Sequence, residues 1–439
     1  MTQQASIGTS KSQCTCTACP LLCEDIKLEP AGAHSACSFG KAAFAAAAAA
    51  FAAGSEAWIN GKPAGLQAAI DRAAADLIAA RRVLITGLAD ATLEAVTAAC
   101  DLAESLGAAI DAGLPESAQA AGPTIARAGG VTAAWDELRD RADLVIFWCS
   151  DPTASHPRFV ERFIAPPLAS GKPRVCIALG SGPALPLGRE FSQLPLASDL
   201  AVEAARCLQV LVAGRELADT LPLLDTGFAA TCTALQTAIG AADCVAIVSS
   251  NAADPVGLED WSIVHLVRTI AHLKPAFQIL LGAGTAAGGG NGAGAAAVCT
   301  WRYAAAGAIA RADRSGGLFL PGEADARRLI KWGEVDAVVA VGRLSPLIEA
   351  AIMARGPALS VVRICDQPQP VPPAGSHVVQ LRSASQLLAT PGTMLREDGC
   401  RVVLTVARDS TTPLLRELLV KLTTAVQQSP SATAVRGRP

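Results

Sequence analysis

The sequence is poor in charge and in aromatic side chains. Charged residues make up 17% of the 439 residues and aromatic residues 4%, with a formal net charge of -3. A net charge that is small and negative provides no basic surface for phosphates. We therefore expect no nucleic-acid partner. Hydrophobic residues make up 51%, which excludes a disordered chain and is enough for several cores.

A long hydrophobic run is also missing. The most apolar stretch, the alanine-rich Lys41 to Ala53, is shorter than the roughly 20 residues that cross a bilayer, so we expect a buried helix there and no membrane partner. The first residues, Met1 to Gln13, have no apolar core followed by a cleavage site. We therefore expect a cytoplasmic protein.

The sequence contains fourteen cysteines, and they are unevenly distributed. In the cytoplasm, cysteines are expected as thiols or metal ligands before disulfides. Nine of them are scattered through apolar segments, where we interpret them as small core residues. The other five lie within the first 37 residues, at Cys14, Cys16, Cys19, Cys23 and Cys37.

Short apolar runs alternate with helical patterns along the chain, which predicts an α/β fold with parallel sheets. A helix pattern over Ala91 to Leu106 follows the first run. The predicted strands are Arg82 to Leu88, Asp143 to Cys149, Arg174 to Leu179, Cys244 to Ser249, Phe277 to Leu281, Val335 to Val341 and Ser360 to Cys365. Ligands of such folds bind at the carboxyl ends of the strands.

A glycine-rich segment, Gly282 to Gly294, directly follows a predicted strand and indicates a functional loop. Gly282, Gly284 and Ala287 match only a loose form of the dinucleotide fingerprint, because no helix with a following strand and terminal acid is evident. This pattern alone therefore favours a ligand loop without naming its ligand.

The clustered cysteines have the spacing C-x2-C-x3-C-x13-C over Cys16, Cys19, Cys23 and Cys37. Four thiolates are what a [4Fe-4S] cluster requires, one for each iron. A second interpretation is a tetrahedral zinc site of Cys16, Cys19, His34 and Cys37, which leaves Cys23 unused. A third is four reduced thiols without a metal.

The stretch CTACPLLCEDIKL, ending in ACSFGKAAF, resembles the N-terminus of the B-type subunit of formylmethanofuran dehydrogenase, which is a member of the molybdopterin oxidoreductase superfamily. Further similar segments follow in the order that they have in that protein: WINGKPAGLQAAIDRAAADL, LAESLGAAID, RADLVIFWCSDPTASHPRFVERF, NGAGAAAVCTWRYAAAG, PGEADARRLIKWGEVDAVVAVG and PGTMLREDG. Only the tail beyond about Asp409 lies outside the resemblance.

The resemblance implies a multi-domain, formate dehydrogenase-like fold. We expect a cysteine-rich, iron-sulfur-type region over 1–57, an α/β domain over 58–140 plus 286–409, an inserted Rossmann-like domain over 141–285, and a partly disordered tail over 410–439. In the family these domains hold a tungsten or molybdenum pterin. The corresponding pterin region here is expected, as a vestige, around His156, Gly282, Gly284 and Asn291.

One departure from the family decides the expected function. The dehydrogenase ligates its metal through a cysteine or selenocysteine, but the corresponding stretch, Asp111 to Ala121, contains no cysteine and no histidine. Because a soft metal needs a soft ligand, we expect no bound tungsten or molybdenum pterin and no catalytic residue. The departure does not affect the [4Fe-4S] ligand set of Cys16, Cys19, Cys23 and Cys37.

A dehydrogenase-like subunit without its metal ligand resembles the B-type subunit of the bacterial formyltransferase/hydrolase complex of tetrahydromethanopterin-dependent one-carbon metabolism. The resemblance implies a non-catalytic scaffold. Its implied partners are an A-type subunit that resembles amidohydrolases, a C-type subunit, which completes the assembly, and a D-type formyltransferase, which together yield formate. The alternative is a redox-active B-type subunit of formylmethanofuran dehydrogenase that binds the metal pterin and [4Fe-4S].

Two local patterns have structural explanations. His156, with Ser155 and Asp151, suggests a hydrolase triad, but three residues within six positions rarely face one another, and we expect His156 to hold its loop instead. Trp301, Arg302 and Tyr303 follow the glycine-rich segment. These residue types are favoured at protein interfaces, and we interpret the three as a contact between subunits.

Overall fold

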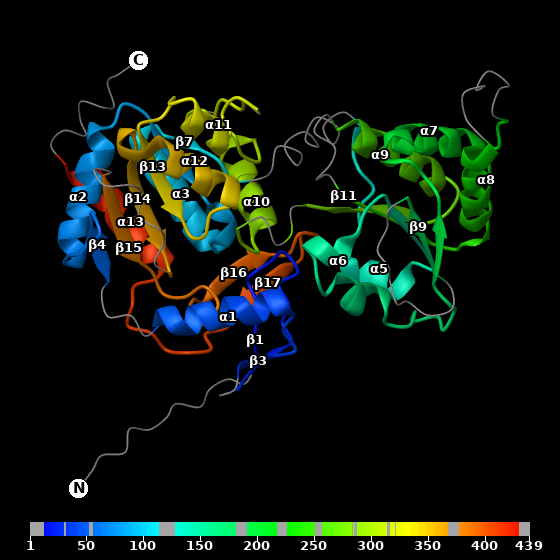
Figure 1. The fold of residues 1–439 in the computed structure, drawn as a ribbon, viewed down its shortest axis with the longest axis horizontal. Coiled ribbons are helices and arrows are strands. Elements are labelled where there is room, and N and C mark those ends of the chain that lie inside the picture. The colour runs from blue at the N-terminus through cyan, green and yellow to red at the C-terminus, as the bar shows by residue number, and fades with distance from the viewer. Residues whose placement is uncertain are drawn as a thin grey trace, which may run out of the picture. The chain divides into compact units, whose positions relative to one another are not determined.

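Two compact units, each built on a parallel β-sheet, make up the chain (Figure 1). The computed structural model places Met1–Leu114 and Thr285–Pro439 in a first unit and Pro115–Gly284 in an inserted unit. It describes residues 13–29, 32–51, 56–113, 128–180, 191–216, 226–250, 257–282, 284, 288–313, 317–320, 322–367 and 377–429.

The first unit contains a seven-stranded sheet in the order β5-β4-β15-β14-β13-β6-β7. Five neighbouring strands are parallel, and β4 and β5 extend the sheet in antiparallel fashion beyond β15. The strands are β4 (Ala57–Ile59), β5 (Lys62–Pro63), β6 (Val83–Thr86), β7 (Ala109–Ile110), β13 (Ala337–Val341), β14 (Ser360–Cys365) and β15 (Val378–Arg382). The strand order reverses between β6 and β13.

Helices cover both faces of this sheet, which explains why its central strands are apolar throughout rather than alternating. On one face, Ile85 and Val339 pack against α2 (Leu66–Ala79), α3 (Leu93–Leu106), α10 (Gly292–Tyr303) and α13 (Leu415–Gln428). On the other face, Leu84 and Val338 pack against α11 (Ala326–Lys331) and α12 (Pro346–Arg355). A 3-10 turn, η1 (Leu88–Asp90), links β6 to α3.

Small antiparallel elements complete the first unit. The N-terminal segment forms the sheet β1-β2-β3, with β1 (Gln13–Cys14), β2 (Ile26–Glu29) and β3 (Gly32–His34), followed by α1 (Ser38–Phe51). Near the C-terminus, β16 (Gly392–Leu395) and β17 (Arg401–Leu404) pair as a hairpin.

The inserted unit has a five-stranded parallel sheet in the order β10-β9-β8-β11-β12, the arrangement of a doubly wound fold. Its strands are β8 (Leu144–Trp148), β9 (Val175–Leu179), β10 (Phe191–Leu194), β11 (Val245–Ser250) and β12 (Ala276–Leu281). Its helical segments are α5 (Trp135–Arg141), α6 (Pro152–Ser155), the π-helix η2 (Val160–Ile164), the 3-10 turn η3 (Ser198–Leu200), α7 (Ala201–Val212), α8 (Thr226–Ala241) and α9 (Leu258–Ala271).

The structure confirms an α/β fold with parallel sheets, and each of the seven predicted strands is present. The helix predicted over Ala91 to Leu106 begins two residues later, at Leu93, because Thr92 caps it through a hydrogen bond from the Ala95 N–H. The inserted unit begins at Pro115, before the expected boundary at 141, and residues expected in the C-terminal tail form α13.

The expectation of a buried helix over Lys41 to Ala53 is wrong. This segment forms most of α1, but only a narrow stripe of it, including Ala43, Phe44 and Ala47, is buried. Alanine supplies high helix propensity and little apolar area, so the run specifies a helix without specifying its burial.

In the part of the chain that the structure describes, no helix combines the length and the apolar character needed to span a bilayer.

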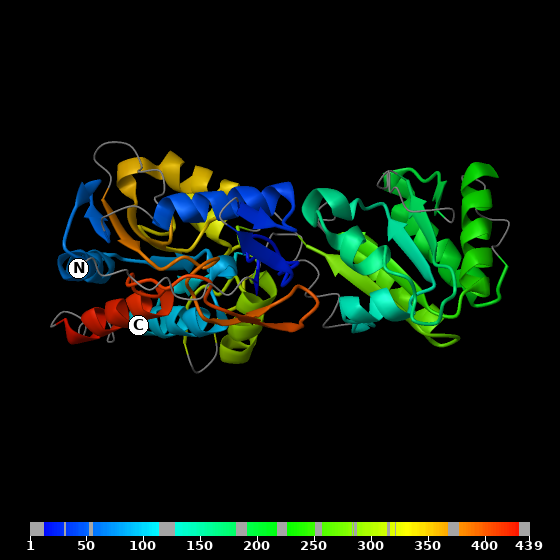
Figure 2. The same cartoon turned by 90° about the horizontal axis from the view of Figure 1, so that it is seen from below.

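Helix α13 packs along α2 and α3, as Figure 2 shows for the red C-terminal helix. Leu418, Leu419 and Leu422 are fully buried in the core of the first unit, whereas Val420 on the same helix is 48% exposed. Residues beyond the family resemblance are therefore part of the core.

We predict that Leu422→Ala lowers the free energy of unfolding by about 2–5 kcal/mol, because it leaves a cavity between α13 and the sheet. Val420→Ala, the matched control, changes it by less than about 0.5 kcal/mol. Urea unfolding followed by circular dichroism measures both. Equal effects of the two variants would show that α13 is not part of the core.

Candidate metal centre

The N-terminal cysteines lie on a tight loop between β1 and β2. The Cys16 N–H donates to the Cys23 carbonyl at 2.9 Å, and the Leu22 N–H donates to the Cys19 carbonyl at 3.2 Å. Leu22 has a φ of 42°, the left-handed conformation that lets the chain reverse here. The loop thus places Cys16, Cys19 and Cys23 on one short closed turn.

Cys37 reaches the same place from the start of α1. Its carbonyl accepts the Lys41 N–H at 2.9 Å, and its Sγ accepts the Gly40 N–H at 3.4 Å, so its sulfur lies at the positive end of the helix. A Cβ at Gly40 would be 3.3 Å from the Cys16 Sγ and 3.7 Å from the Cys37 Sγ. Gly40 therefore lets two sulfurs approach one point.

Burial dominates the electrostatics of these thiols. It raises the pKa of Cys16 to about 12 and also raises the pKa of Cys19, and in both cases the neighbouring thiols of Cys23 and Cys37 add to the increase. The four sulfurs are thus close enough to influence one another. Burial thus favours the neutral thiols of Cys16 and Cys19, and a bound cation is what stabilises buried thiolates.

The ligand atoms proposed for a single zinc ion do not form a compact group. Thiolates around one tetrahedral zinc lie about 3.8 Å apart. Among the described residues, no three of Cys16, Cys19, Cys23, His34 and Cys37 have ligand atoms within 4.8 Å of one another. A cube of four irons and four sulfides lies between its thiolates and keeps them farther apart.

His34, a ligand of the alternative zinc site, is exposed and paired with a carboxylate. Its Nε2 pairs with Glu29 Oε2 at 3.0 Å, and its side chain is 53% exposed. The structure thus brings Cys16, Cys19, Cys23 and Cys37 together and leaves His34 outside.

The glycine-rich segment packs directly against the cysteine loop. A Cβ at Gly290 would lie 2.8 Å from the Thr17 carbonyl oxygen and 2.9 Å from that of Cys19. A Cβ at Gly289 would lie 2.4 Å from the carbonyl oxygen of Ala89. Gly289 and Gly290 are buried. The glycines here allow close contact between segments of the chain.

A buried ion pair ties the same loop to the sheet. Arg343, which follows β13, pairs through Nη2 with Asp90 Oδ1 at 2.7 Å, and its backbone N–H donates to Asp90 Oδ2 at 3.1 Å. The same Nη2 also donates to the Thr17 carbonyl at 3.4 Å. Asp90 is 1% exposed, and its proximity raises the pKa of Arg343, against the effect of burial.

The hairpin β16-β17 closes the cysteine loop from another side. Leu22 forms a small apolar cluster with Met394, Val402 and Leu404 of the hairpin. Leu22 and Met394 are at most 1% exposed. Protein contacts alone therefore order much of this loop.

Asp111, where the family-like segment without a soft ligand begins, has a structural role. Its carboxylate accepts the N–H groups of Ala326 at 2.8 Å, Gly113 at 3.2 Å and Ala308 at 3.4 Å. Burial raises its pKa to about 6 despite these bonds. The rest of the segment, residues 114–121, lies outside the described residues.

Asn291, expected in the vestigial pterin region, joins three segments of the first unit. Its Nδ2 donates to the Ala91 carbonyl at 2.5 Å, its Oδ1 accepts the Leu395 N–H at 2.8 Å, and its backbone N–H donates to the Ala89 carbonyl at 2.7 Å. Both side-chain atoms are thus occupied by protein.

The other expected pterin residues, Gly282, Gly284 and His156, belong to the inserted unit. A Cβ at Gly284 would lie 2.2 Å from the Ser155 carbonyl oxygen, so this glycine also serves close packing. His156 is fully buried, and its ring is edge-on to Trp135 with centroids 6.0 Å apart.

Two of the suggested triad residues do bond. Ser155 Oγ and His156 Nδ1 are 2.9 Å apart. Asp151, however, caps α6 by accepting the Thr153 N–H and hydroxyl, at 2.8 Å and 2.6 Å. These contacts agree with the expectation that His156 holds its loop in place.

Exposure to solvent differs among Trp301, Arg302 and Tyr303. Trp301 is 80% exposed and Tyr303 is 3% exposed. Arg302 Nη2 pairs with Asp101 and Glu104, each at 2.6 Å. Of the three, Trp301 is thus the one available for the expected contact between subunits.

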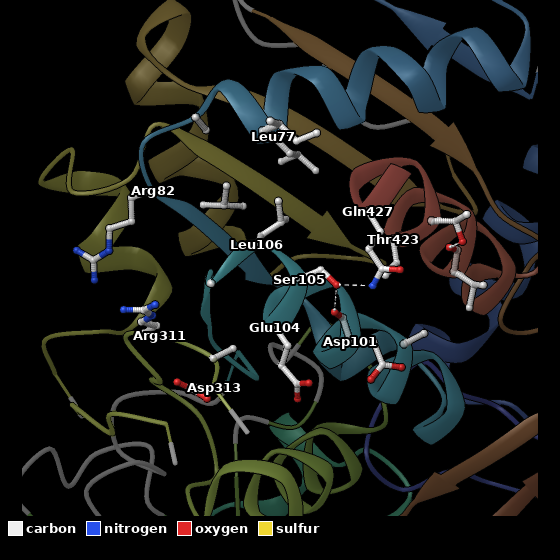
Figure 3. A pocket seen from close by; sticks show the side chains of 18 of the residues that line it. Leu77, Arg82, Asp101, Glu104, Ser105, Leu106, Arg311, Asp313, Thr423 and Gln427 are labelled. Atoms are coloured by element: carbon white, nitrogen blue, oxygen red, sulfur yellow. Dashed lines mark hydrogen bonds between the residues drawn. The ribbon is translucent and has the colours of Figure 1, made fainter. Parts of the chain in front are cut away.

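A cavity of about 860 Å³ lies at the amino end of β6, between α2, α3 and α13 (Figure 3). Gln427 Nε2 donates to Ser105 Oγ across it at 3.0 Å. Among its charged residues, Asp101 and Glu104 pair with Arg302, and Arg82 pairs with Glu334 at 3.3 Å. Arg81, Arg311 and Asp313 also line it. The sequence did not indicate this cavity.

No family model and no curated protein sequence matches the chain. A solved structure does. It is a chain from the X-ray crystal structure of the formyltransferase/hydrolase complex (FhcABCD) from Methylorubrum extorquens in complex with methylofuran, with a TM-score of 0.66 and 21% identity. The match covers 85% of this chain and 99% of the other.

The protein has the fold of a chain of that complex. At this identity the likeness is one of fold, and it extends over almost the whole of the formyltransferase/hydrolase chain. It agrees with the resemblance found in the sequence.

We predict that Gly290→Ala destabilises the first unit by about 1–3 kcal/mol, because the added methyl group must displace the backbone of the cysteine loop. Gly65→Ala is the matched control, since a Cβ at Gly65 meets nothing within 4 Å. Thermal unfolding of both variants provides the comparison. A Gly290→Ala protein as stable as Gly65→Ala would contradict the close packing described here.

Proposed function

We propose that this protein is the non-catalytic B-type subunit of a cytoplasmic formyltransferase/hydrolase complex of tetrahydromethanopterin-dependent one-carbon metabolism. In this role it scaffolds the proteins that transfer and hydrolyse the formyl group to yield formate. Its partners are an A-type subunit that resembles amidohydrolases, a C-type subunit, which completes the assembly, and a D-type formyltransferase. Its domains descend from the molybdopterin oxidoreductase fold.

The fold likeness is the observation that carries this proposal. The match spans 99% of a chain that comes from a formyltransferase/hydrolase complex. The segments that resemble the dehydrogenase in sequence also follow one another in the same order over most of the chain. The sequence and the fold thus resemble subunits of two related complexes, and the fold match is to the formyltransferase/hydrolase complex.

The non-catalytic role rests on the missing ligand and on the occupied positions around it. Asp111 to Ala121 offers no soft ligand for tungsten or molybdenum. In the expected pterin region, the side chain of Asn291 bonds protein backbone, and Gly284 and Gly290 are packed against backbone as well. These contacts favour a structural use of the former cofactor region.

Exposed apolar side chains on the first unit support a role among partners. Trp301 is 80% exposed, Trp332 72% and Leu347 60%. A large apolar side chain in water is common singly, but tryptophan is strongly enriched at the centres of protein interfaces. We assign these residues to contacts with the partner proteins.

We predict that the protein purified from its own cells carries companion proteins of the A, C and D types and contains no stoichiometric tungsten, molybdenum or pterin. Expressed alone, it should be poorly soluble because its partner surface is exposed. Native mass spectrometry with elemental analysis measures assembly and metal together. A monodisperse monomer would contradict the scaffold, and a stoichiometric metal pterin would favour the redox-active dehydrogenase.

We further propose that Cys16, Cys19, Cys23 and Cys37 hold a [4Fe-4S] cluster. The support is the gathering of four buried or half-buried sulfurs around a closed loop and a helix start, with no compact three-ligand group among them. Such a cluster can carry an electron or can stabilise the fold of the loop. A hydrolytic assembly transfers no electrons, so only the stabilising role applies here.

We predict about four irons per chain and broad visible absorption, both lost in Cys23→Ser because one iron loses its thiolate. Cys14→Ser is the matched control: Cys14 is buried beside the loop but outside the ligand set, so its variant keeps the iron. Iron assays and absorption spectra follow both. Zinc that is unaffected by Cys23→Ser would instead support the Cys16, Cys19, His34 and Cys37 site, and an absence of metal would leave four thiols.

A further inference from the structure

Buried polar atoms without a partner gather at one edge of the sheet of the first unit. Among the described residues, eleven buried side-chain nitrogen or oxygen atoms have no hydrogen-bond partner. Seven of them lie around the carboxyl edge of this sheet, on Thr17, Thr86, Asp366, Ser383, Ser385 and Gln386. Because partnerless buried polar atoms are rare in native proteins, their concentration here calls for a missing partner.

Four of these residues are held together by the ends of two neighbouring strands. In the parallel pair β14 and β15, Cys365 is opposite Arg382, so Asp366 and Ser383 each follow the last residue of a strand. The Ser383 N–H donates to the Cys365 carbonyl at 3.0 Å, and the Gln386 N–H donates to Asp366 Oδ2 at 3.2 Å. The backbone thus fixes the cluster.

Most of the side-chain polar atoms of this cluster nevertheless lack a hydrogen-bond partner. Asp366 is 7% exposed, Ser383 2%, Ser385 6% and Gln386 4%. The Oδ1 of Asp366, the Ser383 hydroxyl oxygen and both amide atoms of Gln386 have no partner, whereas the Ser385 hydroxyl interacts with the Asp366 carboxyl and lowers its pKa. Together they offer a carboxylate acceptor, two hydroxyl groups that donate or accept, and an amide that does both.

The charges around the cluster select the ligand. Asp90 is neutralised by Arg343, with which it pairs at 2.7 Å. Asp366 has Arg343 nearby, but burial and the neighbouring Asp90 raise its pKa to about 6. A further anion would add negative charge beside two buried carboxylates, so a phosphate or a carboxylate ligand is disfavoured.

We propose that Asp366, Ser383, Ser385 and Gln386 form a buried binding site for a small uncharged ligand that both donates and accepts hydrogen bonds. Ordered water and a polar organic molecule share this chemistry. The site lies at the edge where parallel α/β sheets bind their ligands. The site uses none of the cysteine ligands, so the proposal does not depend on whether the metal cluster is present.

Thermal unfolding of Ser383→Ala in the full chain tests the site, because no group in the described part of the protein bonds the Ser383 hydroxyl. A hydroxyl that bonds a ligand loses that bond on substitution, so we expect this variant to lower the unfolding midpoint. Ser150→Ala is the control, because Ser150 is 4% exposed and its hydroxyl donates to the Val248 carbonyl at 3.2 Å. A midpoint that stays or rises in Ser383→Ala, while Ser150→Ala lowers its own, would overturn the proposal, since removing an unsatisfied buried hydroxyl removes a desolvation penalty.

A high-resolution crystal structure, with mass spectrometry of small molecules released from the same preparation, identifies the occupant. Water density alone on these side chains, with nothing organic released, assigns the site to water. Organic density with a matching released molecule assigns it to that molecule. A dry cluster whose side chains bond one another, or a bound anion, would overturn the proposal.

Discussion

The ion pair between Asp90 and Arg343 is the contact on which the rest of the first unit depends. It joins the turn after β6 to the turn after β13, the two strands between which the strand order reverses, and the same guanidinium reaches the Thr17 carbonyl of the cysteine loop. Because both charges are largely buried, loss of either partner leaves the other uncompensated, a situation that typically costs about 3–5 kcal/mol. One pair thus links the sheet to the cysteine loop.

This arrangement changes what the carboxyl edge of the sheet can do. In doubly wound folds, the point where the strand order reverses is normally open to a ligand. Here Gly289 packs on Ala89 and Gly290 packs on the cysteine loop. The glycine-rich segment thus occupies the position where a ligand would bind. Polar atoms without a hydrogen-bond partner lie nearby, at the ends of β14 and β15. A scaffold with a residual polar site is consistent with both observations.

The strands were predictable because continuous apolar runs such as Ala337 to Val341 are specified locally. The gathering of the four cysteines followed from their spacing. Tertiary contacts decided the rest. Local sequence could not show that Gly290 serves packing, or that α1 is half exposed. The importance of Asp366 was also hidden, because a single acid after a strand has no pattern until β15 brings Ser383 beside it.

The central claim is that the cysteine loop and the parallel sheet form one cooperative structure. Amide hydrogen exchange tests it most directly, because the N–H groups of Cys16 and Asn291 donate to the Cys23 and Ala89 carbonyls, respectively. The account predicts that these amides are protected together with those of β6 and β13, and that Asp90→Asn weakens the protection of all of them. Rapid exchange in the loop while the sheet stays protected would contradict it.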